Sequence, residues 1–184
     1  NNLNNTIKIM CGFFGFIDFD GNIRDVDEQE IKAGADRISY RGPDDSGSFL
    51  DENVIIYFRR LSIIDLDAPS QPYTNKKKTI TMVCNGEIYN YIELRKKLES
   101  LGYKFKTKSD PEVLLRMLIH YGKDAINYLD GMWAFAFLDK NKKVLMLSRD
   151  KFSEKPLYYR HINNDFFFGS SITYILSLCN KSPV

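Results

Sequence analysis

Two apolar runs late in the sequence constrain the fold most strongly. WAFAFLD spans residues 133–139, VLMLSRD spans residues 144–150, and the polar turn KNKK separates them. Two β-rich runs joined by so short a turn predict a β-hairpin. Each run is almost continuously apolar, which is typical of strands that are covered on both faces. The chain should therefore contain a hairpin that is buried on both sides.

The rest of the chain alternates between β-rich runs and helical patterns. We expect strands at 11–18, 53–58, 60–66, 79–85 and 103–107, and a second hairpin from LYYR (157–160) and DFFFGSS (165–171). Helices are predicted at 28–38, from Asn90 toward Gly102, at 111–121 and at 172–178. The first three begin at the capping boxes Asp27/Glu30, Asn90/Glu93 and Ser109/Glu112. The run RGPDDSGS (41–48) predicts a loop, and Gly86 predicts a tight turn. This order favours an α+β architecture with largely antiparallel sheets.

Length and composition indicate one soluble globular domain. The 184 residues, of which 43% are hydrophobic, are enough to bury a substantial core. The 26 basic and 24 acidic residues leave no large field to attract nucleic acid or an anionic membrane. No run approaches the roughly 20 apolar residues of a membrane helix, and the Asn-rich start lacks a signal-peptide pattern. We expect a cytoplasmic protein, with a flexible leader or propeptide at 1–10 and one domain at 11–184.

The cysteines and histidines argue against a disulfide framework or a zinc site. The three cysteines, Cys11, Cys84 and Cys179, are an odd number and show neither CxxC nor Cys/His spacing. The two histidines, His120 and His161, lie far apart in the sequence and are expected to be ordinary surface or packing residues. No metal is expected, and each thiol has to be considered separately.

Polar groups that could act on an amide gather in four short segments at strand ends. The segments are Met10-Cys11-Gly12, Arg60, Asn85-Gly86-Glu87 and Asp110. A thiolate can attack a carboxamide, polarised donors can hold the oxyanion, and a cation with an anion can fix an amino acid by its α-carboxylate and α-amine. The segments supply each of these groups except a base for the thiol. They indicate an amide-hydrolysing site without a histidine.

The missing base is supplied if Cys11 is the first residue of the mature protein. A free α-amine has a reference pKa of about 7.7 to 8.0, close to about 8.5 for a thiol, so the nucleophile could use its own amino group. When Cys11 is joined to Met10, the same nitrogen is an amide and takes no proton at neutral pH. Activity of Cys11 therefore depends on cleavage just before it.

These segments resemble the glutaminase domain of the asparagine synthetase family, a class II glutamine amidotransferase with an amino-terminal nucleophile. The matching motifs, in family order, are MCGFFGF (10–16), RGPDDSG (41–47), RLSIIDL (60–66), NGEIYNY (85–91), SDPE (109–112), LDGMWAFAFLD (129–139), RDKFSEKPLYY (149–159) and FFGSS (167–171). Together they cover nearly the whole chain from Met10. The resemblance implies a four-layer α/β/β/α sandwich of two largely antiparallel sheets, of the Ntn-hydrolase type.

The resemblance also implies a role for each matched residue. Cys11 would attack L-glutamine to give a thioester, with its freed α-amine as base. The side chain of Asn85 and the backbone N–H of Gly86 would form the oxyanion hole. Arg60 would bind the α-carboxylate, and Glu87 and Asp110 would hold the α-amino end. The wall of the pocket would be formed by Leu61, Ser62, Ile63 and Ile64.

The resemblance implies partners that this sequence does not contain. In the family, ammonia passes to a synthetase domain, whose ATP-pyrophosphatase glycine-serine loop has no counterpart here. We expect ATP and magnesium to be needed only in such a domain, and no cofactor in this one. The acceptor would be aspartate or another carboxylate, such as that of a sugar acid in polysaccharide assembly. A homodimer is left open.

Three departures from the family pattern are visible. Tyr40 stands where the family usually has His, Ser153 where it has Gly, and Gly169-Ser170-Ser171 where it has Ala-Ser-Glu. None falls on a predicted glutamine contact. Ser153 is expected to force a non-glycine backbone into a strained conformation, and the missing Glu bears on the approach of a partner domain.

Plainer interpretations stay open beside these roles. Cys11 could be a buried small hydrophobe, Asp110 a helix N-cap, Arg60 a surface charge like Arg59, and Asn85-Gly86 an ordinary turn. For the whole chain, the alternative is a non-catalytic glutamine-binding or scaffold domain in which residues 1–10 block Cys11.

Overall fold

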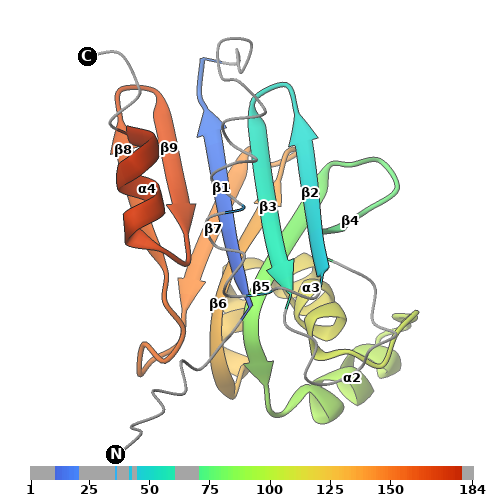
Figure 1. The fold of residues 1–184 in the computed structure, drawn as a ribbon. Helices are drawn as coiled ribbons and strands as arrows, with labels where there is room; N and C mark the ends of the chain where they lie inside the picture. The colour runs from blue at the N-terminus through green and yellow to red at the C-terminus, as the bar shows by residue number, and fades with distance from the viewer. Residues whose placement is uncertain (1–10, 21–35, 37–41, 43–44, 61–70, 180–184) are drawn as a thin grey trace, which may run out of the picture.

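A computed structural model gives the fold of the chain (Figure 1). It describes residues 11–20, 36, 42, 45–60 and 71–179. The predicted helix at 28–38 except residue 36, its capping box, most of the strand predicted at 60–66 and the proposed leader 1–10 lie outside the described residues. None of the helices in the described part of the chain is both long and apolar enough to cross a membrane.

The first sheet has five antiparallel strands in the order β2-β3-β1-β9-β8. Their bounds are β1 Gly12–Asp18, β2 Asp45–Asp51, β3 Val54–Arg60, β8 Tyr158–Ile162 and β9 Asp165–Gly169. The predicted hairpin of β8 and β9 is confirmed. Gly15 of β1 allows close packing, because a Cβ at that position would lie 2.0 Å from the ring of Phe168.

The second sheet has four antiparallel strands in the order β4-β5-β6-β7. They are β4 Tyr73–Thr74, β5 Ile80–Ile88, β6 Gly131–Asp139 and β7 Val144–Arg149. The hairpin predicted from residues 133–150 is formed by β6 and β7. Of the two strands of this hairpin, only β6 is covered on both faces. Val144 at the start of β7 is 45% exposed, because β7 is an edge strand.

Helices cover the outer face of each sheet, which makes four layers (Figure 1). The helices α2 Tyr91–Ser100 and α3 Asp110–Tyr121, with the 3₁₀ helix η3 Gly122–Tyr128, pack on the second sheet. The helix α4 Ile172–Cys179 packs on β8 and β9 of the first sheet. The predicted α+β sandwich of two antiparallel sheets is confirmed.

Alternation along β6 separates two hydrophobic cores. Trp133, Phe135 and Phe137 face the helices α2 and α3. The alternate residues Ala134, Ala136 and Leu138 face the first sheet. Successive side chains of a strand point to opposite faces, and the small alanines leave room between the sheets for the large phenylalanine rings of the first sheet. Both faces of β6 are therefore buried, as its almost continuously apolar sequence requires.

Several local predictions were wrong, each for a tertiary reason. Residues 45–48 of the predicted loop form part of β2, because pairing with β3 through the backbone leaves polar side chains free to face solvent. Residues 103–107 form no strand. Instead, the carboxylate of Glu112 accepts the N–H groups of Lys106 and Thr107, and Arg95 donates to the Thr107 carbonyl.

Two predicted capping boxes do not form. Asn90 stands at the N-cap of α2 but makes no cap hydrogen bond. Its side chain instead donates to Tyr128 O and accepts from Asp130 N. Ser109 stands at the N-cap of α3, also without a cap bond, and its hydroxyl lies 2.8 Å from that of Thr107. In both cases a neighbouring segment takes the polar side chain from the helix.

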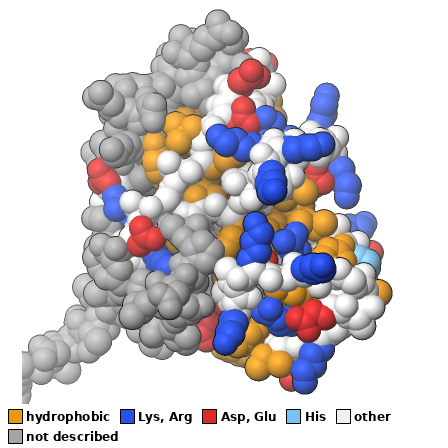
Figure 2. All heavy atoms as spheres, turned by 90° about the vertical axis from the view of Figure 1, so that its right-hand side faces the viewer, with side chains coloured by type: hydrophobic (Ala, Val, Ile, Leu, Met, Phe, Trp, Pro, Cys, Tyr) orange, Lys and Arg blue, Asp and Glu red, His pale blue; other side chains and the backbone are white. Residues whose placement is uncertain are grey.

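Basic side chains spread over the face that Figure 2 shows, mixed with apolar and uncharged groups. Some of them cover aromatic rings. The Lys97 ammonium lies 4.0 Å from the centre of the Tyr128 ring, and the Arg95 guanidinium 4.4 Å from that of Phe105. Such cation–π contacts make these two charges part of the packing of α2.

Candidate active site

Cys11 lies directly before β1, at the end of the sandwich where β1 begins and β3 and β5 finish (Figure 1). We call this the Cys11 end. The side chain is partly buried and packs against the core between the sheets. The register pairs Gly12 with Arg59, so the next step places Cys11 opposite Arg60. Cys11 is therefore not the fully buried hydrophobe of the plainer interpretation.

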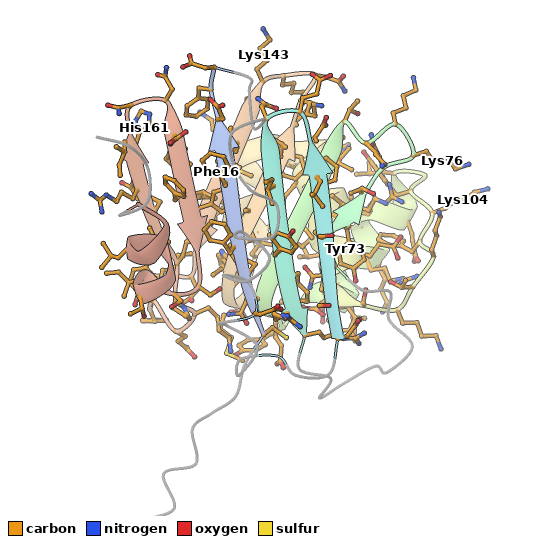
Figure 3. All side chains as sticks on the ribbon, turned by 45° about the horizontal axis from the view of Figure 1, so that its top comes forward. Phe16, Tyr73, Lys76, Lys104, Lys143 and His161 are labelled. Carbon is orange, nitrogen blue, oxygen red and sulfur yellow. The ribbon has the colours of Figure 1, made fainter. Side chains whose placement is uncertain are left out.

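Arg60, the last residue of β3, faces the space between the sheets. Ile56 and Phe58 of the same strand point into the core there, and alternation gives Arg60 the same side. Arg59 points the other way and pairs with Asp36. The positive charge of Arg60 acts on the phenol of Tyr73, which is labelled in Figure 3. The question of which arginine points inward is settled in favour of Arg60.

Asn85 of β5 is buried and presents an unused donor. It is 2% exposed, and its Nδ2 has no hydrogen-bond partner among the residues that the structure describes. By alternation it shares the inner side of β5 with Val83, which belongs to the core between the sheets. A buried amide without a partner costs free energy, so this Nδ2 is suited to a ligand oxygen.

Gly86 lies within β5, not in the tight turn that the sequence suggested, because the β5–β6 ladder continues to the pair Ile88–Gly131. Its φ is +148°, and a Cβ would lie 2.1 Å from Met132 O. A larger residue would collide with β6. The position therefore needs glycine for close approach of β6 and for its backbone conformation.

The backbone N–H of Gly86 points to the β4 side of β5. Ile80 O and Cys84 N bond on that side, to Asn75 N and to the Gln71 side chain. Alternate residues of a strand direct their N–H groups to the same edge, so Gly86 follows Cys84. Beyond Gly86, Ile88 N on this edge donates to Asp110 Oδ2 over 2.9 Å. On this edge, the N–H of Gly86 thus lies between Cys84 N, which Gln71 holds, and Ile88 N, which Asp110 holds.

Asp110 and Glu87 supply negative charge beside this edge. Asp110 is the first residue of α3, and its carboxylate accepts from Ile88 rather than capping a helix from the N-cap position. Burial raises the pKa of Asp110 and the charge of Glu87 adds to the rise, while hydrogen bonds from the N–H groups of Ile88 and Asp110 oppose it. An ammonium group would relieve this electrostatic cost.

The other thiol near the site is unsuited to be the nucleophile. Cys84 is 3% exposed and faces α3. Burial raises the pKa of this thiol well above its usual value, the charges of Asp110 and Cys11 raise it further, and Lys155 opposes them. A thiol held protonated is a poor nucleophile, so Cys84 fits the structural role expected for it.

The histidines are engaged elsewhere. His161 packs against Phe19 and Phe166 at the end of the sandwich opposite Cys11, where Figure 3 labels it. His120 contacts Tyr103 through its Nδ1, 3.1 Å from the hydroxyl, and stacks edge-on with Tyr121. Both make the packing contacts that were predicted.

The loop after β7 is held by Asp150. Its Oδ1 accepts from Phe152 N and Glu154 N, and its Oδ2 from Lys155 N. Burial alone would raise the pKa of Asp150, but these hydrogen bonds from backbone N–H groups outweigh it and lower the pKa. Ser153 in this loop has a φ of +60°, so the strain expected from a non-glycine residue there is confirmed.

The predicted site residues divide into two groups. The Cys11 end of the sandwich brings together Cys11, Arg60, Asn85, Gly86, Glu87 and Asp110. The predicted pocket-wall residues Leu61, Ser62, Ile63 and Ile64 lie outside the described residues. Sequence reasoning missed Gln71 and Tyr73, whose only signal was a polar loop before a strand. A thiol, two donors, a cation and two carboxylates can together bind and cleave an amino acid that carries a carboxamide.

Comparison with known sequences is consistent with a site that cleaves a carboxamide. The family of the glutamine amidotransferase domain matches residues 10–183. Asparagine synthetase (glutamine-hydrolyzing) 1 of Bacillus subtilis (strain 168) is 48% identical over 162 residues, 88% of this chain and 26% of that protein. Asparagine synthetase B (glutamine-hydrolyzing) of Escherichia coli (strain K12) is 34% identical over 175 residues, 92% of this chain and 30% of that protein.

Comparison with solved structures supports the fold. Glutamine phosphoribosylpyrophosphate amidotransferase from B. subtilis, complexed with ADP and GMP, aligns with a TM-score of 0.69 at 18% identity, over 90% of this chain and 43% of that one. The sandwich thus has the same fold as the matching part of this amidotransferase. The chain spans only about a quarter of the first synthetase, 26% of its length.

Proposed function

The chain belongs to the glutamine amidotransferase domain family, in the branch found in glutamine-hydrolysing asparagine synthetases, and on that premise we propose that Cys11 hydrolyses L-glutamine to glutamate and ammonia. The observation that carries the proposal is the gathering, at one end of the sandwich, of a thiol, an inward-facing arginine and an amide donor that has no partner among the described residues. Those three groups match the reacting carbon, the α-carboxylate and the developing oxyanion of bound glutamine.

The first step is attack of the Cys11 thiol on the side-chain carbonyl carbon of glutamine. The free α-amine of Cys11 takes the thiol proton, which its reference pKa of about 7.7 to 8.0 allows near neutral pH. A C–S bond forms, and the carbonyl electron pair moves to oxygen. Asn85 Nδ2 and the Gly86 N–H donate to this oxyanion.

Collapse of the tetrahedral intermediate breaks the C–N bond. The α-ammonium of Cys11 returns its proton to the leaving nitrogen, so ammonia departs and a glutamyl thioester remains on Cys11. Water then attacks the thioester, with the same amine as base and the same two donors on the oxyanion. The C–S bond breaks, glutamate leaves, and the thiol is restored. The net reaction consumes one water for each glutamine.

Charge holds the substrate in register for this attack. The Arg60 guanidinium suits the α-carboxylate, which it can bind with two parallel hydrogen bonds. Glu87 and Asp110 suit the α-ammonium, and the raised pKa of Asp110 indicates a carboxylate that gains from a nearby cation. Leu61 to Ile64, which continue the chain from Arg60, would form the pocket wall.

The ammonia would serve a synthetase domain, carried by the same gene product or by a partner in the cytoplasm. The relatives are about four times as long as the aligned region, which covers 26% of the B. subtilis protein. Aspartate or another carboxylate would be the acceptor, and its activation would need ATP and magnesium in that domain. Hydrolysis itself calls for a thiol, an amine and donors, so we propose no cofactor for this domain.

Glutamate release from three preparations tests the proposal. These are the chain with Cys11 as first residue, the chain beginning at Asn1, and Cys11→Ala with the same amino terminus as the first. We expect turnover only from the first. Intact mass confirms each amino terminus.

Each other outcome has a distinct meaning. Turnover that survives Cys11→Ala would reject the nucleophile. Glutamine binding without turnover by the chain that begins at Cys11 would favour the non-catalytic glutamine-binding domain.

A further inference from the structure

Gln71 makes a two-point hydrogen bond to the backbone of β5. Its Nε2 donates to Cys84 O over 3.0 Å, and its Oε1 accepts from Cys84 N over 2.6 Å. All four groups are buried, and Gln71 is only 9% exposed. A carboxamide offers a donor and an acceptor in the same planar arrangement as a peptide group. The side chain of Gln71 therefore bonds to Cys84 as a neighbouring strand would.

This bond continues the ladder between β4 and β5 after β4 has ended. The backbone register pairs Tyr73 with Met82. Two steps further along the same register, Gln71 falls opposite Cys84. Pro72 between them has no N–H to donate, and β4 is only two residues long. The Gln71 carboxamide replaces the missing strand at the point where β5 reaches the site.

The residues after Cys84 are Asn85 and Gly86, the proposed oxyanion donors. On the same edge of β5, the next bond in the described part of the chain is that of Ile88 N to Asp110 Oδ2. On this edge of β5, Asn85 to Glu87 thus lie between two side-chain anchors, while β6 pairs with the opposite edge. Gly86 has no side chain to limit its backbone, so the direction of its N–H depends on these two anchors together with the β6 ladder.

We propose that Gln71 is a positioning residue of the glutaminase site, whose carboxamide holds β5 so that Asn85 Nδ2 and the Gly86 N–H converge on one oxyanion. The inference rests on the proposed glutamine hydrolysis and adds a residue to its machinery. Gln71 touches neither the substrate nor Cys11 in this role. Its contribution is the geometry of the donors, which matters most in the transition state.

The test compares variants with Cys11 as first residue. Gln71→Met keeps the length of the side chain but loses the planar donor and acceptor. Gln71→Glu keeps the acceptor for Cys84 N and loses the donor when ionised. The control is Asn75→Ala, because Asn75 Oδ1 accepts from Thr79 N and Ile80 N at the other end of the same edge. Measurements are kcat and KM for glutamine, the unfolding midpoint, and the alkylation rate of Cys11 by iodoacetamide, which needs no oxyanion hole.

We expect Gln71→Met to lower kcat about 10- to 100-fold, since small misplacements of catalytic groups cost this much. The KM for glutamine and the alkylation rate of Cys11 should not change. Asn75→Ala should lower the unfolding midpoint and leave kcat unchanged. A protonated Glu has an O–H to donate, so the kcat of Gln71→Glu relative to the unsubstituted chain should rise as the pH falls. This pH-dependent rescue remains measurable if Gln71→Met fails to fold.

Unchanged kcat in both Gln71 variants would overturn the positioning role. So would an equal loss of kcat in Asn75→Ala, or a Gln71→Glu ratio that does not vary with pH, because a merely structural bond would give either result. If the unsubstituted chain releases no glutamate, the proposed function falls and the role of Gln71 falls with it. If that chain is active and the variants equal it, only the role of Gln71 falls.

Discussion

The two ends of the sandwich treat their polar groups in opposite ways. At the end opposite Cys11, Asp51 pairs with Lys140 across the two sheets. Burial alone would raise the pKa of Asp51, but the hydrogen bonds from Lys140 and from the N–H of Glu52 outweigh it and lower the pKa. At the Cys11 end, burial and Glu87 raise the pKa of Asp110. One end pairs its charges across the two sheets, whereas the other buries a carboxylate beside a second negative charge, where a cation would be favourable.

The contrast extends to two asparagines on the same strand ladder. Asn75 uses its carboxamide fully, accepting from Thr79 N and Ile80 N and donating to Thr79 Oγ1. The Nδ2 of Asn85 has no such partner in the described ranges. Buried polar groups are normally hydrogen-bonded, and each exception calls for an explanation. Under the proposed function, the explanation for Asn85 is that its Nδ2 donates to an oxygen of the substrate.

Exchanging these asparagines for alanine should separate activity from stability. Asn85→Ala is expected to lower kcat for glutamine about 100- to 1000-fold, the usual loss for one oxyanion donor. Asn75→Ala should leave kcat unchanged and cost about 1 to 2 kcal/mol of unfolding free energy, because two backbone N–H groups lose their acceptor. Steady-state kinetics and urea unfolding measure both. Similar kinetics for the two variants would remove the contrast.

The adjacent arginines allow a second comparison. Arg60→Lys should raise the KM for glutamine about 10- to 100-fold, as expected when a hydrogen-bonded charge pair loses its fork geometry. Arg59→Lys should change KM little, since Arg59 pairs with Asp36 on the opposite face of β3. Initial rates across a range of glutamine concentrations give both values. A larger effect from Arg59 would mean that the inward direction of Arg60 has no bearing on the substrate.

Replacing Asp110 or Asp51 by asparagine should shift the unfolding midpoint in opposite directions. Asp110 has a raised pKa in the folded state, so its ionisation opposes folding above that pKa, and this cost disappears as the pH falls below about 3.9, the unfolded value. Asp110→Asn should therefore raise the unfolding midpoint at neutral pH, by less as the pH falls, while weakening glutamine binding.

Asp51 shows the reverse linkage. Its pKa is lowered on folding, so its stabilising contribution is present above the unfolded pKa and is lost as the pH falls through the folded one. Asp51→Asn should lower the unfolding midpoint at neutral pH by a small amount, about 0 to 1 kcal/mol for a pair that stays partly exposed. Thermal unfolding between acid and neutral pH measures the direction in which each variant shifts the unfolding midpoint. A shift in the same direction for both variants would contradict the contrast between the two ends of the sandwich.

The elements that were predicted correctly from the sequence are those that depend on local pattern. The hairpin of β6 and β7 and that of β8 and β9 were predictable because apolar runs and turn residues are adjacent in the chain. The strand β2 was not, because an edge strand with exposed Ser46 and Ser48 resembles a loop until its partner is known. The same applies to Asn90, whose partners Tyr128 and Asp130 come from another segment.

At the site, the sequence predicted the residues but not their hydrogen bonding or ionisation. The motif supplied Asn85 and Asp110. Burial by distant elements leaves Asn85 with a donor that has no partner among the described residues, and it raises the pKa of Asp110. The role of Gln71 depends on where β4 stops, which no local pattern reveals. The predicted order of strands could place the site at one end, but not the bonds that shape it.

The most direct test of the central claim is the mass of the chain after rapid acid quenching during glutamine turnover. With Cys11 as first residue, we expect a glutamyl thioester on the peptide that contains Cys11 and none on the peptide that contains Cys84. The chain beginning at Asn1 should show no adduct. Glutamate release without an adduct on Cys11, or an adduct on Cys84 instead, would contradict the account.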